Sequence, residues 1–206
     1  MDFDLPTELV ALKDTTARFA AERIAPHARE WDRDGAFPDS ILRELAEQGF
    51  LGIRVPEEYG GAGGSYLSFA VILEEIARHD GGLALAVEAH NGLASEHILL
   101  SGSEAQKEEF LPPLASGEKL GSWCLTEPGA GTDAAAIRSS AVRHGDEWVL
   151  NGSKQFITNG SRAGIFVVVA TGDEKPEDTS GSFEEERVGD GRRDGGIHTR
   201  SRTDIE

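Results

Sequence analysis

Residues Gly121–Asp133 read GSWCLTEPGAGTD, and a second stretch, Asn151–Gly160, reads NGSKQFITNG. Each holds a short run of β-forming residues that ends in a threonine, Ser122–Thr126 in the first and Gln155–Thr158 in the second. Proline and glycine follow the first run and predict a sharp turn, and the dipeptide Asn159–Gly160 predicts a tight turn after the second. We therefore predict two strand ends in a β domain.

Each predicted strand end carries one aromatic side chain and one hydroxyl, Trp123 with Thr126 and Phe156 with Thr158. A flat ring system that forms hydrogen bonds suits this combination better than a phosphate group or a metal ion. Two ordinary strand ends of a β-barrel, with threonines present for their β propensity, are an equally good interpretation of the pattern alone.

The linked motifs LTEPGAGTD and GSKQFITNG resemble a pair of signatures in the middle domain of the acyl-CoA dehydrogenase flavoproteins. The resemblance runs from near the N-terminus to about Ala170. It implies an α+β fold, with an all-α helical domain over residues 1–118 and an incomplete β-barrel middle domain over residues 119–171. The helical third domain of that family has no counterpart here, so we expect a truncated form whose own activity is open.

The first 118 residues carry apolar side chains at helical spacing. We predict helices over five segments: Thr7 (as N-cap) to Pro26, Asp39 or Ser40 to Gly49, Tyr66–Arg78, Leu83–Leu100, and Ser103–Phe110 with a Ser103–Gln106 capping box and a stop at Pro112–Pro113. The run Gly60–Gly64 lacks both the G-x-G-x-x-G spacing and the lysine of a P-loop, so we expect a loop rather than a phosphate site.

After Gly121 the pattern changes to that of strands, which we predict over Ile137–Arg143, Trp148–Leu150, Gln155–Thr158 and Ile165–Ala170. Residues 172–206 are rich in charge and glycine, with too few large apolar side chains to offset the entropy of ordering, so we predict a disordered tail unlike the family. A shifted reading frame and a genuine acidic tail both account for this segment, and the abrupt change in composition favours the first.

The chain has 37 acidic and 20 basic residues and a formal net charge of −17. This charge argues against nucleic acid or an anionic membrane surface as a partner. It suits a halophilic protein in a high-salt cytoplasm, although simple solubility explains it as well. Cys124 is alone, so no internal disulfide forms, and the sequence shows neither a secretory signal nor a membrane span; we therefore expect a cytoplasmic protein.

The resemblance also implies a reaction and a cofactor: FAD-dependent α,β-dehydrogenation of an acyl-CoA thioester, in which a base removes the α-proton while the flavin accepts a hydride from the β-carbon. It further implies electron-transfer flavoprotein as the electron acceptor and, at full length, a homo-oligomer. By matched position, the resemblance places Thr132 on the CoA portion of the substrate and implies these flavin-binding residues: Trp123, Cys124, Leu125, Thr126, Phe156, Ile157 and Thr158.

No catalytic base is assigned within this chain, because the family takes that carboxylate from the third domain. Glu127 is interpreted as a structural residue at a strand end. The histidines at positions 27, 79, 90 and 97 have no metal-ligand spacing, so we expect no metal site and interpret them as surface or satisfied interior residues. No G-x-S-x-G motif supports hydrolase chemistry.

Two other functions remain open from the sequence. One is a non-catalytic helical fragment whose apolar surface binds another chain. The other is a related flavin oxidase or monooxygenase on the same scaffold, acting on a different substrate such as a nitroalkane.

The net charge of −17 generates a first prediction. Because self-repulsion is screened by salt, the melting temperature should be higher in molar KCl than in dilute buffer. Thermal unfolding followed by circular dichroism in the two buffers checks this, and equal melting temperatures would rule out the high-salt interpretation.

Overall fold

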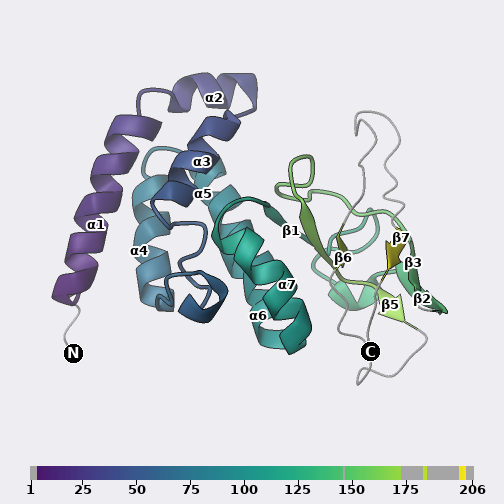
Figure 1. Ribbon diagram of the computed structural model, residues 1–206. Coiled ribbons are helices and arrows are strands. Elements are labelled where there is room, and N and C mark those ends of the chain that lie inside the picture. Colours follow the sequence, from purple (N-terminus) through teal and green to yellow (C-terminus); the bar gives the residue numbers. More distant parts are fainter. Residues whose placement is uncertain (1–3, 146, 173–182, 185–199, 203–206) are drawn as a thin grey trace.

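A computed structural model describes residues 4–145, 147–172, 183–184 and 200–202. Helices occupy the first part of the chain and strands the second, which confirms the α+β fold, a helical domain followed by part of a β domain. Figure 1 shows helices α1 to α7 on one side and the strands on the other. The predicted disorder of residues 172–206 falls mainly outside the described residues.

The helical domain lies between Thr7 and Ala115. Its elements are α1 (Thr7–Phe19), the π-helical η1 (Ala20–Ile24), α2 (Ala28–Asp34), α3 (Asp39–Glu47), the 3₁₀ turn η2 (Glu57–Tyr59), α4 (Tyr66–Ala77), α5 (Gly81–Glu88), the π-helical η3 (Ala89–Ser95), α6 (Glu96–Ser101) and α7 (Glu104–Ala115).

The predicted starts of the later helices are confirmed, and the first is wrong by one residue. The capping box before α7 is present: Gln106 N–H donates to Ser103 Oγ at 3.3 Å, and Ser103 N–H donates to Gln106 Oε1 at 2.9 Å. Thr7 is not an N-cap, because Pro6 holds that position with no side-chain bond. The short helix α2 was not predicted; none of its residues is buried, so it lacks a clear apolar stripe.

Helix α7 continues through Pro112 and Pro113, where we predicted a stop. The two prolines remove the N–H groups that would pair with the carbonyls of Glu108 and Glu109. Both glutamates are exposed, so water can reach that side of the helix. Beyond the prolines the backbone bonds resume, with Ser116 N–H donating to the Pro112 carbonyl at 3.0 Å.

The helix predicted over Leu83–Leu100 is instead three consecutive helical segments, α5, η3 and α6. A π-helix holds an extra residue in its turn, and segments of this kind are frequent at functional sites. Here the π-helical segment carries the buried side chains of His90, Asn91 and Ser95. Ser95 Oγ donates to the carbonyl of His90 at 2.8 Å.

Two apolar clusters hold the molecule together. The first lies within the helical domain and includes Ile24, Leu45, Ile72 and Leu83. The second packs α6 and α7 against the strand residue Ile165, so it joins the helical domain to the β domain. Among the described residues no helix is long and apolar enough to cross a lipid bilayer.

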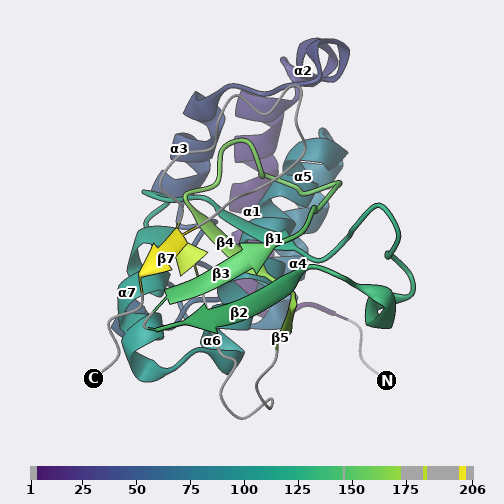
Figure 2. The same ribbon diagram turned by 90° about the vertical axis from the view of Figure 1, so that its right-hand side faces the viewer.

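The described strands form two sheets (Figure 2). In the order β1-β4-β6, β1 (Gly121–Cys124) runs parallel to β4 (Ile165–Val168), with Gly121 opposite Ile165, and β4 is antiparallel to β6 (Phe183–Glu184). The other sheet has the order β5 (Thr171–Gly172), β2 (Ser140–His144), β3 (Glu147–Asn151) and β7 (Arg200–Arg202). A 3₁₀ turn, η4 (Ala134–Ala136), precedes β2.

The strand predicted over Gln155–Thr158 is wrong, because this segment is a loop. Phe156 has a φ of 58°, a left-handed conformation that cannot continue a strand. The predicted turn that follows is present, with Gly160 N–H bonded to the Ile157 carbonyl at 3.0 Å and Asn159 at a φ of 65°. The β propensity of phenylalanine, isoleucine and threonine is overridden here by the contacts of the loop.

His90 joins the two domains. Its ring is fully buried, and its Nδ1 accepts a hydrogen bond from the Gly121 N–H, the first residue of β1, at 2.9 Å. Its Nε2 lies 3.0 Å from the Leu51 carbonyl and 3.2 Å from the Leu114 carbonyl. Because carbonyls only accept, the proton sits on Nε2 and the ring is neutral. This confirms a satisfied interior histidine.

The pH dependence of stability follows from this residue. Burial lowers the pKa of His90 to about 4 from 6.5, so the unfolded chain binds a proton between these values that the folded chain does not. Stability should therefore fall by about 3 kcal/mol from His90 alone as the pH drops from 7 to 4. Urea unfolding across this range should show a flatter pH dependence, and a lower stability at pH 7, for His90→Asn; an unchanged slope would contradict this account.

Candidate functional site

The structure brings the two sequence motifs together. Gln155 N–H donates to the Thr126 carbonyl at 2.8 Å, and Ser122 Oγ donates to the Thr158 carbonyl at 2.6 Å. The loop 154–159 therefore lies against β1 and the residues that follow it, so Thr126 and Thr158 belong to one region of the surface. The predicted proximity of the two segments is confirmed, although one is a loop and not a strand.

Phe156 is the most exposed large apolar side chain in this region, at 87%. A phenylalanine in a left-handed conformation costs conformational energy, and its ring gains no burial within the chain to offset that cost. Strain of this kind gathers at functional sites. The ring is therefore available to stack on a flat ligand, which is the arrangement the sequence predicted.

The β1 residues differ in what they offer a ligand. The side chain of Cys124 is fully buried, so only its backbone is available. Trp123 is half-buried and its ring lies 5.3 Å from that of His97, while its Nε1 is buried with no hydrogen-bond partner. Leu125 and Thr126 are half-buried.

The loop after Thr126 is open. Gly129 has no atom within 4 Å of the position a Cβ would take, and at Gly131 only Thr126 Cγ2 comes as near as 3.9 Å. Thr132 is exposed in the same loop. This clear surface beside Thr126, together with the exposed Phe156, fits a large flat cofactor with an extended polar portion.

Glu127 lies beneath this loop and is engaged on both carboxylate oxygens. Its Oε2 accepts from Arg138 N–H at 2.7 Å, and its Oε1 accepts from Ser139 N–H at 2.9 Å and from Lys154 Nζ at 2.8 Å. Lys154 Nζ also donates to the Leu125 carbonyl at 2.9 Å. Burial alone would raise the pKa of Glu127, but these donors outweigh it and hold the pKa at about 2. The structural interpretation of Glu127 is confirmed.

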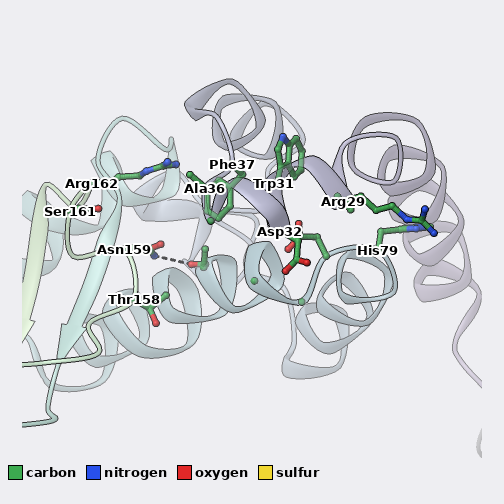
Figure 3. Close-up of a pocket in the computed structure, with 16 residues that line it drawn as sticks. Arg29, Trp31, Asp32, Ala36, Phe37, His79, Thr158, Asn159, Ser161 and Arg162 are labelled. Atoms are coloured by element: carbon green, nitrogen blue, oxygen red, sulfur yellow. Dashed lines mark hydrogen bonds between the residues drawn. The ribbon is translucent and has the colours of Figure 1, made fainter.

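A cavity of about 670 Å³ lies between the helical domain and the loop that follows Phe156. Figure 3 shows Thr158, Asn159, Ser161 and Arg162 on one side and Trp31, Asp32 and His79 on the other. Arg162 pairs with Asp39 at 3.3 Å. Its guanidinium lies 4.8 Å from the centre of the Phe37 ring.

Sequence reasoning predicted only Thr158 among the residues of this cavity. The others come from α2 and the loop after it, from the start of α5 and from the turn after Thr158, and no motif links these segments. Only packing of the helical domain against the loop brings them together. Among the described residues no group of histidine, cysteine and acidic side chains is arranged to hold a metal ion.

Comparison with protein families gives two adjacent matches. Residues 6–118 match the family model "Acyl-CoA dehydrogenase, N-terminal domain", and residues 122–203 match "Acyl-CoA dehydrogenase, middle domain". The second match extends beyond residue 171, where we predicted that the middle domain ends. The division at residues 171 and 172 remains a prediction.

Individual relatives agree with the family models. The short-chain-specific acyl-CoA dehydrogenase of Clostridium acetobutylicum is 42% identical over 173 residues, which cover 84% of this chain and 46% of the relative. The butyryl-CoA dehydrogenase structure from Megasphaera elsdenii has a TM-score of 0.80 at 38% identity and covers 90% of this chain and 50% of that one. A glutaryl-CoA dehydrogenase from Mycobacterium smegmatis in complex with FADH2 has a TM-score of 0.79 at 30% identity, covering 98% of this chain and 54% of that one. The chain thus spans about half the length of the proteins it matches.

The buried Glu127–Lys154 pair allows a prediction about stability. Lys154→Met leaves the Glu127 carboxylate buried without its cation, so the free energy of unfolding should fall by about 3 to 5 kcal/mol. Lys107→Met is the matched control, because Lys107 pairs with the exposed Glu104 and its loss should cost less than about 1 kcal/mol. Urea unfolding at pH 7 measures both, and equal losses in the two variants would show that the Glu127–Lys154 pair contributes no more than a surface pair.

Proposed function

Because the chain belongs to the acyl-CoA dehydrogenase family, we propose that it forms the flavin-contacting part of an enzyme that dehydrogenates acyl-CoA thioesters with FAD. The observation that supports this most directly is the joining of the two motifs: the loop that carries Phe156 and Thr158 is hydrogen-bonded to β1 and to Thr126. A family match alone would leave the two segments unplaced.

The residues at the site divide the work of holding the cofactor. The backbone of Trp123, Cys124 and Leu125 and the hydroxyl of Thr126 would bind the polar edge of the flavin ring. Phe156 would stack on its face, with Ile157 behind it and the Thr158 hydroxyl donating a hydrogen bond to the ring. When bound, FAD supplies the two-electron oxidation. Hydrogen-bond donors placed at the ring edge stabilise the negative charge that the oxidation leaves there.

The substrate assignment is narrower. Thr132, exposed in the loop after Thr126, would contact the CoA portion of the thioester. No described residue takes the role of the base that removes the α-proton. Glu127 is unsuitable, because a carboxylate with a pKa of about 2 that already accepts three hydrogen bonds is a poor base at neutral pH. The catalytic base therefore comes from outside the residues described.

The wider setting of the protein is also part of the proposal. We expect electron-transfer flavoprotein to take the electrons, a homo-oligomer to form in the full-length protein, and the cytoplasm to be the compartment. The acidic composition supports a high-salt cytoplasm.

Flavin binding tests the proposal. The 206-residue chain, purified with and without added FAD, should retain flavin with quenched fluorescence, because Phe156 stacks on the ring. Phe156→Ala should weaken binding about tenfold. Leu100→Ala is the matched control, since Leu100 is a similarly exposed apolar residue, 71%, on α6. Both variants are measured by fluorescence titration.

The outcomes separate the alternative functions. Failure of the unmodified chain to bind any flavin would count against the proposal and favour a helical interaction fragment. Flavin binding without enoyl-CoA product, assayed with an artificial electron acceptor, would leave the flavin site standing. If the chain supplemented with the family's third domain also gave no product, a related oxidase or monooxygenase would be favoured.

A further inference from the structure

Asn159 connects three segments that are far apart in the sequence. Its Nδ2 donates to the carbonyl of Ala86, on α5, at 2.9 Å and to the carbonyl of Gly121, at the start of β1, at 3.2 Å. Figure 3 shows the bond to Ala86 beside the cavity. One amide group therefore links the helical domain, the first strand of the β domain and the loop that follows Phe156.

The backbone of Asn159 also has a specific conformation. Its φ is 65°, and its carbonyl accepts from Arg162 N–H at 2.8 Å and from Ala163 N–H at 2.9 Å. Glycine adopts this φ with less strain than asparagine does. The turn alone would therefore favour glycine, and the two side-chain hydrogen bonds account for the asparagine.

The peptide of Gly121 is held from both sides as a result. His90 Nδ1 accepts from its N–H, and Asn159 Nδ2 donates to its carbonyl. Gly121 also lies very close to η3, since a Cβ there would come within 2.7 Å of the Ala94 Cβ. The start of β1 is thus fixed against the helical domain, and Asn159 fixes the loop to the same point.

Thr158 lies between these contacts. Its carbonyl accepts from Ser122 Oγ at 2.6 Å, and the next residue is anchored by its amide to Ala86 and Gly121. With the backbone held on both sides, the side chain of Thr158 keeps one position at the edge of the cavity.

We propose that Asn159 is a positioning residue for Thr158, which it holds against the flavin by bonding the loop to α5 and to β1. This inference rests on the proposed function, because it assigns Thr158 to the cofactor. It goes beyond that function in making the cofactor contact depend on the helical domain, through the carbonyl of Ala86.

Two substitutions at Asn159 isolate the amide. Asn159→Gly keeps the left-handed backbone and removes both donors, whereas Asn159→Asp keeps the size and replaces the donor with an acceptor that repels both carbonyls. Ser161→Ala is the control, because Ser161 is exposed in the same turn. Ser122→Ala removes the hold on Thr158 from the other side without altering Asn159.

The first measurement needs no flavin. Hydrogen exchange of the amides in residues 154–163 should become about tenfold faster in Asn159→Gly and in Ser122→Ala, and faster still in Asn159→Asp, but not in Ser161→Ala. Circular dichroism confirms that each variant is folded. Unchanged exchange in Asn159→Gly overturns the inference, whether or not the chain binds FAD.

The second measurement separates positioning from general stability. Asn159→Gly should weaken FAD binding about tenfold in the unmodified background and about onefold in a Thr158→Val background, because the hydroxyl that it positions is then absent. Equal losses in the two backgrounds would overturn the role assigned to Asn159 while leaving the flavin site intact. If the unmodified chain binds no FAD, the proposed function fails and hydrogen exchange alone decides whether Asn159 holds the loop.

Discussion

A neutral imidazole, buried between the two domains, is the contact on which the rest of the site depends. His90 can accept from Gly121 and donate to the carbonyls of Leu51 and Leu114 only when Nε2 alone carries a proton. Its position is set by the π-helical segment η3, and its partner is the residue where β1 begins. The register of β1 against β4, and hence the place of Thr126, follows from that first bond.

The general architecture could be predicted from the sequence because it rests on local signals. The Ser103–Gln106 capping box and the change from helical to strand periodicity near Gly121 depend only on neighbouring residues. The loop at Phe156 could not be predicted, since its left-handed backbone is sustained by bonds to β1 and α5, which are distant in the sequence. The cavity was missed for the same reason, and α7 passes through two prolines because its solvent-facing side tolerates the lost bonds.

The site shows a division between groups that hold structure and groups that remain available. Glu127 and Lys154 are charged, buried and mutually satisfied, and they fasten the loop between Thr126 and β2. Phe156 and Thr132 are exposed and make no comparable contact within the described residues. Charge in this region is thus used for rigidity, while the surface offered to a ligand is aromatic and hydroxylic, which suits a flat ring more than a phosphate or a metal ion.

The π-helical segment Ala89–Ser95 has a consequence for how this helix can change during evolution. Such a segment accommodates one residue more than a regular α-helix, so losing a single residue here would restore the regular ladder. Everything that follows would then be rotated by about 100° around the helix axis. His97 would no longer meet the Trp123 ring, and α6 would present a different face to Ile165. Length variation at this point of the chain would therefore reorient the whole contact between the two domains rather than alter a single loop.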